Sequence, residues 1–388
     1  MHPSADGTPE RLQFATRELR DTAFARALDA LKLEVEASLD DSDVQYIVWL
    51  RRFSRCMEIL GRVVLHSSWE PLSFSVGVLA LFVHKQIEAL EIGHSVLHGT
   101  YDRMPGAQRF RARGFRWLMP IDESSWMYQH NVRHHQYTNV SGRDPDLRYG
   151  PVRLSARVPY RFYHALQPLS AITSCLGFGA FMNAQATGLI DVYLDPSGPP
   201  LVLRDRSFAS VMRAHYALLR KYLKYYFKEA LFFPALAGPG FSKVLLGNML
   251  SDVLRNIYTA LSIHCGHVNT DDYEPATRAR GRGQWYVMQV EATHNFEVAP
   301  WVSILCGTSD RQIEHHLFPR LPNNRLREIA PRVRHICAQH GVRYRTDTWP
   351  STLGQVAKTL WRLSWKTLPL TAAGSAVITR DGGHSDAV

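Results

Sequence analysis

The sequence predicts an all-α integral membrane protein, built from helical hairpins with about four spans and a cytosolic helical cap. The first observation is the apolar run within 72–89, which begins after Pro71 and is long enough to enter a bilayer. The second is a Gly-Pro-Gly turn at 238–240, between two further apolar legs. The third is that three histidine clusters lie outside the apolar runs, which indicates a metal site in the cap.

Residues 1–54 are predicted to form a cytosolic N-terminal segment, because they are polar and contain no apolar run of membrane length. The first hairpin follows, with a short leg over 56–69 and a longer leg over 72–89. The longer leg ends just before His94 and His98, so the first histidine cluster lies where this helix leaves the membrane.

The second hairpin is predicted from the apolar legs 225–236 and 244–264. Residues 99–161 are rich in arginine, so the positive-inside rule places them, and the clusters around them, on the cytosolic side. If all clusters share that side, the chain crosses the membrane an even number of times between the second and third. We therefore expect the apolar stretch 162–194 to be interfacial or re-entrant.

Charge and cysteine content exclude several classes of protein. The formal charge of +10 is spread over arginine-rich loops, and no nucleic-acid reader motif accompanies it, so no nucleic-acid partner is expected. Anionic membrane lipid, or an acidic protein, is the expected partner of these loops. The 5 cysteines form no CxxC pair, which argues against a disulfide framework and a thiolate zinc site.

Three clusters carry the candidate metal ligands. They are His94 and His98; His130, His134 and His135; and Gln312, His315 and His316. Histidines four apart stack on one helix face, whereas adjacent histidines point roughly 100° apart. An adjacent pair can therefore serve two metals. This set is too large for one metal, and imidazole suits iron, so the sequence predicts a site for two non-haem irons.

Two other interpretations compete with this one. The pairs Glu91/His94 and Glu291/His294 have the Glu-x-x-His spacing of carboxylate-bridged bundles, but that site would leave the second and third clusters unused. A histidine-rich membrane transporter or metal-binding protein would place its ligands in the middle of the spans. The clusters here lie at span ends and in loops.

The clusters HSVLH (94–98), HNVRHH (130–135) and QIEHH (312–316) resemble the three histidine boxes of the membrane fatty-acid desaturases, and bacterial members most of all. The resemblance extends to Tyr137-Thr138-Asn139, to Asp144-Pro-Asp146 and to the segment after the third box. It covers 55–348, which implies one desaturase-like membrane domain followed by a C-terminal tail over 349–388. It also implies a multi-pass protein of the cytoplasmic membrane with its active site facing the cytosol.

The resemblance further implies that two irons activate O2 and remove two hydrogens from a fatty acyl chain. The ligands that it assigns are His94, His98, His130, His134, His135, His267, His315 and His316. No cytochrome b5 motif precedes the first apolar run, so a separate ferredoxin with its reductase is the expected electron source. A hydroxylase could use the same site. The acyl chain length, its carrier and the bond position stay open.

Five further residues are expected near the metals without being assigned as ligands. Asp144, Asp146 and Glu314 are placed to accept the N–H of a ligating histidine, although solvated loop charges are an equal alternative. Gln312 begins the third box as in front-end desaturases, and we expect it to act through water or hydrogen bonding. His264 either reaches the metals through water or is a hydrogen-bonded core histidine.

Overall fold

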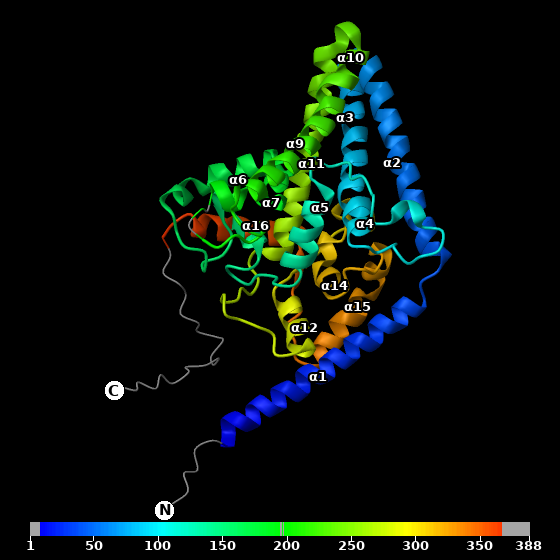
Figure 1. The fold of residues 1–388 in the computed structure, drawn as a ribbon. Coiled ribbons are helices and arrows are strands. Elements are labelled where there is room, and N and C mark those ends of the chain that lie inside the picture. The colour runs from blue at the N-terminus through cyan, green and yellow to red at the C-terminus, as the bar shows by residue number, and fades with distance from the viewer. Residues whose placement is uncertain (1–7, 195, 197, 367–388) are drawn as a thin grey trace, which may run out of the picture.

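The structure, a computed structural model, describes residues 8–194, 196 and 198–366, and helices dominate it (Figure 1). The predicted all-α class is confirmed. Strands in the described part of the chain are short and form two pairs, one antiparallel and one parallel. They are β1 (Arg148–Tyr149) with β2 (Val152–Arg153), and β3 (Asn295–Glu297) with β4 (Thr346–Thr348).

Two helical hairpins form a tower that rises above the rest of the molecule (Figure 1). The first consists of α2 (Asp41–Ser67) and α3 (Pro71–Gln86). The second runs from α9 through η6 and α10 to a short turn, η7, and back down α11. Their bounds are α9 (Phe208–Tyr226), η6 (Phe227–Phe232), α10 (Phe233–Leu236), η7 (Gly238–Gly240) and α11 (Phe241–His267). All four predicted legs are helical.

The first hairpin begins earlier than the predicted leg at 56, because Asp40 caps α2. Its carboxylate accepts from the backbone N–H of Ser42, and the side chain of Asp43 returns a bond to the backbone of Asp40. The Glu70 carboxylate caps α3 by accepting from the backbone N–H groups of Leu72 and Ser73, and Pro71 occupies the first turn, where its missing N–H costs no bond. Local capping therefore fixes where the two legs start.

One described helix, Pro71–Leu97, is long and apolar enough to cross a bilayer. The helices Phe162–Leu176 and Phe178–Ala186 are long and apolar enough only when they are taken together, and the chain bends by 94° where they meet. Charged side chains from three tower helices, α2, α3 and η6, pair inside the tower. Arg62 lies 2.7 Å and Lys85 3.0 Å from the carboxylate of Glu229.

The cap lies below the tower, and α1 runs along its base (Figure 1). Its helices are α1 (Thr8–Ala37), α12 (Arg282–Glu291), α13 (Pro300–Cys306), α14 (Gln312–Leu317) and α15 (Asn323–Gln339). Phe24 and Leu28 of α1 pack with Tyr286, Ile313 and Leu326 in one buried apolar cluster. This core joins α1, α12, α14 and α15, so the third histidine box stands on a rigid base.

A side lobe flanks the tower. It comprises η5 (Phe162–Leu166), α6 (Gln167–Leu176), α7 (Phe178–Ala186), α8 (Ile190–Tyr193) and α16 (Trp349–Leu363). The stretch predicted to be interfacial or re-entrant thus forms bent helices beside the tower. The predicted C-terminal tail begins with α16, and Gln167 Nε2 donates to the Leu360 carbonyl at 2.9 Å. Residues 367–388 lie outside the described residues.

Candidate metal centre

Histidines converge at the base of the tower from four segments. His94 and His98 follow α3, on η1 (Ile87–His94) and just after α4 (Ser95–Leu97). The second cluster follows α5 (Glu123–Trp126) on η3 (Met127–His134). His267 ends α11, and α14 carries the third cluster. Residues far apart in the sequence therefore meet in one buried region.

Two of these segments, η1 and η3, are π-helical, a form that often marks functional sites. In the second cluster the His135 N–H donates to the His130 carbonyl at 3.0 Å, a bond that spans five residues. The wider turn brings His135 Nε2 to 3.3 Å from His130 Nε2. The spacing in the sequence paired His130 with His134, whose rings do stack with centroids 5.1 Å apart, and the π turn adds His135 as a second neighbour of His130. One oxygen of Asp146 also lies within 4.8 Å of nitrogens of His130 and His134.

The first group of imidazoles contains His94, His98, His130 and His315, with one nitrogen of each within 4.8 Å of the others. His94 Nε2 lies 3.2 Å from His130 Nε2 and 3.3 Å from His98 Nε2. Neutral imidazole nitrogens gathered this closely cannot all satisfy one another, because each ring has a single N–H. A shared cation is the partner that fits such a set.

The second group contains His134, His267 and His316, again with one nitrogen of each within 4.8 Å of the others. Gln312 Nε2 lies 2.8 Å from His267 Nε2, so the amide that opens the third box reaches this group. The adjacent pairs divide between the groups. His315 belongs to the first and His316 to the second.

Hydrogen bonds from outside the groups orient two of the rings. His134 Nδ1 lies 3.0 Å from Asp144 and 3.4 Å from Asp146. His316 Nδ1 lies 3.0 Å from Gln289 Oε1 and 3.2 Å from Thr138 Oγ1. The opposite nitrogen of each ring, Nε2, is buried and has no hydrogen-bond partner among the described residues. His134 and His316 thus offer a free nitrogen to the same space.

Sequence reasoning missed Gln289 and Thr138. Thr138 lies within the Tyr-Thr-Asn segment that follows the second box, so its place in that motif was an available signal. Gln289 lies on α12 and has no such signal. Its position next to His316 follows only from the packing of α12 on α14.

The other residues singled out in the sequence lie around the groups. The Glu314 carboxylate accepts from Asn295 at 2.8 Å and from Tyr344 at 2.9 Å. His264 Nδ1 lies 2.6 Å from the carbonyl of Ala260, which is one turn earlier on the same helix. Asp146 also accepts from the amide of Gln185 at 2.9 Å.

Burial controls the protonation of the rings. It holds the pKa of His98, His130, His135, His315 and His316 well below 6.5, which keeps them neutral. Neutral imidazole is the form that binds metal. Burial also acts on His134, but Asp144 and Asp146 outweigh it and raise the pKa of His134 to about 9. Burial raises the pKa of Glu314 to about 7.

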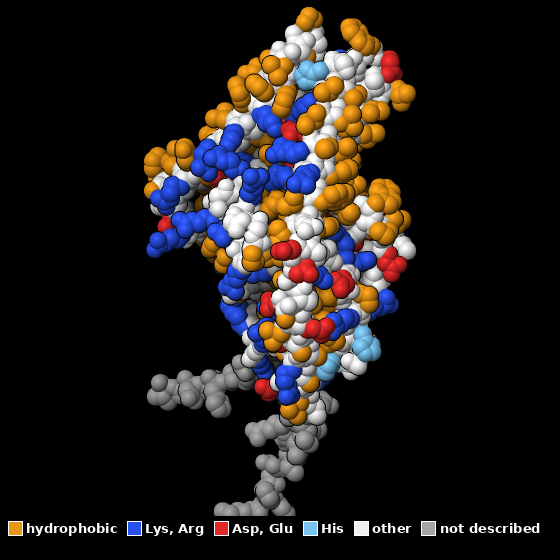
Figure 2. Space-filling model, turned by 90° about the vertical axis from the view of Figure 1, so that its right-hand side faces the viewer, with side chains coloured by type: hydrophobic (Ala, Val, Ile, Leu, Met, Phe, Trp, Pro, Cys, Tyr) orange, Lys and Arg blue, Asp and Glu red, His pale blue; other side chains and the backbone are white. Residues whose placement is uncertain are grey.

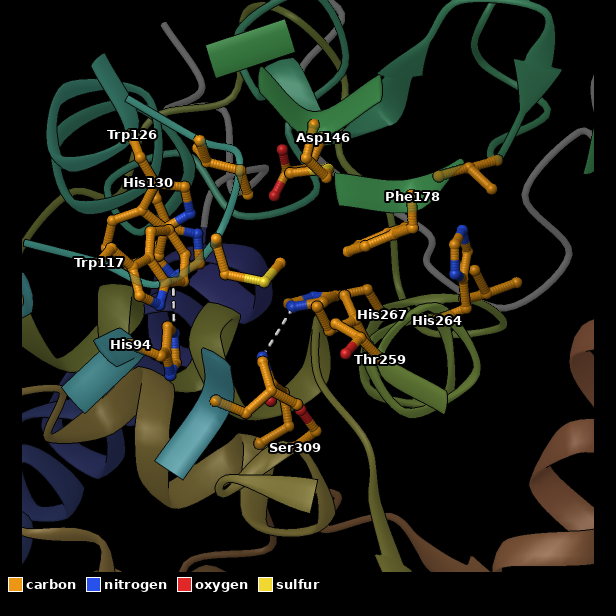
Figure 3. Close-up of a pocket in the computed structure, with 18 residues that line it drawn as sticks. His94, Trp117, Trp126, His130, Asp146, Phe178, Thr259, His264, His267 and Ser309 are labelled. Atoms are coloured by element: carbon orange, nitrogen blue, oxygen red, sulfur yellow. Dashed lines mark hydrogen bonds between the residues drawn. The ribbon is translucent and has the colours of Figure 1, made fainter. Parts of the chain in front are cut away.

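An apolar pocket opens beside the histidines, as Figure 3 shows. His94, His130 and His267 form part of its wall, and the space amounts to about 820 Å³, including the part open to solvent. The apolar part of the wall is formed by Leu90, Trp117, Met119, Ile121, Trp126, Leu154, Phe178, Met182, Ile263 and Val268. A long apolar ligand would fit such a lining, with one stretch of it next to the imidazoles.

Two tryptophans link this pocket to the first group. The Trp126 ring stacks on the His130 ring, with centroids 4.4 Å apart and an interplanar angle of 20°. Trp117 lies edge-on to Trp126 at 5.1 Å. Gly93 admits Trp117, since a Cβ at this glycine would lie 2.0 Å from the indole nitrogen.

The fold and the site define a helical protein with a histidine-lined centre that could hold metal, next to an apolar pocket. Comparison with known proteins agrees with that class. The family model for fatty acid desaturase matches residues 67–348. The chain therefore belongs to the fatty acid desaturase family, whose members are oxidoreductases associated with membranes.

Individual relatives span bacteria and animals. The chain is 32% identical over 349 residues to an NADPH-dependent stearoyl-CoA 9-desaturase of Mycobacterium tuberculosis, covering 88% of this chain and 79% of the relative. It is 23% identical to an sn-1 linoleoyl-lipid 6-desaturase of Synechocystis, covering 87% and 93%. Fatty acid desaturase 3 of Homo sapiens is 22% identical, covering 84% and 69%.

Proposed function

We propose that this protein removes two hydrogens from a fatty acyl chain at a centre of two non-haem irons. The observation that carries the proposal is the convergence of imidazoles in two groups beside an apolar pocket, most of them held neutral by burial. The proposed ligands are His94, His98, His130, His135 and His315 for one iron, and His134, His267 and His316 for the other. Two irons there would supply O2 activation and the removal of hydrogen from an unactivated C–H bond.

The chain's own residues would hold and orient these ligands. Asp144 accepts from His134 Nδ1, and Gln289 faces His316 Nδ1, so each ring turns Nε2 toward the centre. Gln312 would complete the second group through its amide oxygen or a bound water. Turning the amide over would bring Oε1 to the place where Nε2 lies now, next to His267.

The acyl chain would lie in the apolar pocket, where Trp117, Trp126 and Phe178 exclude water from the reacting carbons. Desaturation balances as follows: O2 accepts four electrons and four protons to form two waters. Two electrons and two protons come from the two C–H bonds, and two of each come from a donor and solvent. The named relatives favour a stearoyl-CoA or lipid-linked acyl substrate.

The two donor electrons would come from a separate acidic carrier. A ferredoxin with its reductase fits, and the name of the mycobacterial relative favours NADPH as the ultimate reductant. The docking surface that we propose is the exposed basic loop formed by Arg103, Arg109, Arg111, Arg113 and Arg116. Trp117 follows this loop directly and contacts Trp126, which stacks on His130, so the loop lies a short distance from the centre.

The tower would cross the cytoplasmic membrane as four spans, with the centre on the cytosolic side. Figure 2 shows hydrophobic side chains over much of the tower and most acidic side chains on the body below. Exposed apolar side chains occur on all its helices: Ile59, Leu60, Val63, Leu72, Val76, Leu79, Leu231, Phe232, Leu236, Leu246, Met249 and Leu250. The charges of Arg62, Lys85 and Glu229 face one another inside, where pairing makes them tolerable in a bilayer.

The direct test is expression of the full chain in a host with simple fatty acids, followed by mass spectrometry that locates new double bonds. We expect a new unsaturated product that requires O2 and disappears with His316→Ala. A hydroxylated product would instead assign the site to the related hydroxylation. Wild-type levels of double bonds in the His316→Ala strain would contradict the proposal.

A further inference from the structure

A partly buried arginine of the cap binds the helix that carries the first histidine pair. Arg327 on α15 donates from Nη1 to one oxygen of Glu91 at 2.8 Å and from Nη2 to the other at 2.7 Å. Glu91 lies on η1, and its side chain is 0% exposed. A guanidinium and a carboxylate joined by two parallel bonds have a fixed relative orientation.

The same guanidinium also holds α13. Arg327 Nε donates to Ser303 Oγ at 2.7 Å, and Nη2 donates to the Ser303 carbonyl at 2.9 Å. The Tyr46 hydroxyl from α2 contacts both Glu91 and Arg327. One side chain thus joins α2 and η1 to α13 and α15, two parts of the chain that are far apart in the sequence.

The contact between Arg327 and Glu91 joins the segments that carry the first and third histidine boxes. Glu91 precedes His94 by three residues, and α15 follows soon after α14, which carries His315. The first imidazole group needs His94 from one side and His315 from the other. Arg327 and Glu91 are separated by 236 positions in the chain. Their contact therefore fixes the distance between η1 and α15, which no short stretch of chain connects.

We propose that Arg327 and Glu91 are positioning residues, which set the spacing between the first and third histidine boxes. The proposal rests on the proposed function, because it assigns the pair to the assembly of that metal centre. Mere filling of space would not require a guanidinium, since apolar residues of similar volume can replace buried ion pairs without loss of stability. The shared bonds to Glu91 and Ser303 need the planar fork of arginine, which lysine lacks.

Arg327→Lys tests the proposal, because it keeps the charge but cannot make these bonds together. Arg332→Met is the matched control: Arg332 lies on the same helix and pairs with Glu34, with both side chains largely exposed. The measurements on purified full-length protein are iron per chain, the rate of iron release to a chelator, and the melting temperature after iron removal. We expect Arg327→Lys to release iron about tenfold faster than wild type, while the metal-free protein melts at a somewhat lower temperature but stays folded at the temperature of the assay.

Arg332→Met should release iron at the wild-type rate. Wild-type release from Arg327→Lys would overturn the proposal. If Arg327→Lys does not fold, Tyr46→Phe decides, because it removes one bond to Glu91 and one from Arg327 without removing a charge. Faster release from Tyr46→Phe at an unchanged metal-free melting temperature would support the proposal, and the wild-type rate would overturn it. Failure of the wild-type protein to bind iron would instead count against the proposed function.

Discussion

Asp144 holds His134 in a single orientation: its carboxylate oxygens lie 3.0 and 3.1 Å from His134 Nδ1, and both side chains are almost fully buried. The same carboxylate accepts from the backbone N–H groups of Asn139 and Asp146, both at 2.8 Å. These bonds lock the loop after the second box to the ring. His134 therefore presents Nε2 to the second imidazole group.

Asp144→Asn should lower activity and iron affinity by about 10- to 100-fold, because the uncharged amide replaces one of two accepting oxygens with an NH2 donor and so holds the ring less firmly. Asp41→Asn is the control, since Asp41 is exposed at the start of α2. Desaturation assays and iron titration of the two purified variants check this. Equal activity of the two variants would show that Asp144 does not orient the ring.

Gly93→Ala should displace Trp117 and reduce both stability and activity, because the new Cβ would lie 2.0 Å from the indole nitrogen. Gly354→Ala is the matched control on α16, where a Cβ meets no atom of the described part of the chain within 4 Å. That control should stabilise the helix by about 0.5–1 kcal/mol. Thermal unfolding and acyl turnover of both variants measure the difference, and a neutral Gly93→Ala would contradict this packing.

Turnover should slow as ionic strength rises when the electron donor is limiting, because salt screens the attraction between a basic loop and an acidic carrier. Replacing Arg111 and Arg113 with glutamine should weaken the salt dependence and raise the donor concentration needed for half-maximal rate. Turnover driven by a small neutral reductant serves as the control. A rate that is indifferent to salt under donor-limiting conditions would place the docking surface elsewhere.

The metal-free protein should lose stability as the pH falls from 7 toward 5. Burial holds the pKa of His98, His130 and His315 below 6.5, so unfolding takes up protons in this range and becomes easier. His134 has the opposite sign. Its pKa is raised to about 9, so its contribution to the stability of the folded protein is complete below pH 6.5 and is lost as the pH rises through 9.

Melting temperatures of chelator-treated protein between pH 5 and 9 measure both effects. In the Asp144→Asn variant the melting temperature should fall much less above pH 7 than in wild type. Its fall below pH 7 should be unchanged. A melting temperature that does not change between pH 5 and 7 would show that the imidazoles are not buried and neutral in the folded protein.

The sequence predicts the helical class, the four tower legs and the histidine clusters, because apolar runs, Pro-Gly turns and histidine spacing are local signals. The pairing of His130 with His135 was not predictable from an α-helical period, since it depends on the π turn of η3. Gln289 was missed because its role arises from the packing of α12 on α14. The sequence drew attention to Glu91 only through its spacing from His94, and the bonds between Glu91 and Arg327 are known only from the fold.

Iron analysis of the purified full-length protein tests the central claim most directly. Two irons per chain are expected in wild type, with substantial loss from His316→Ala and from His267→Ala. His264→Ala should keep both irons, because His264 Nδ1 faces the Ala260 carbonyl and the residue lies outside both imidazole groups. Active wild-type protein that holds no iron, or a His316→Ala variant that retains two irons and normal desaturation, would contradict the account.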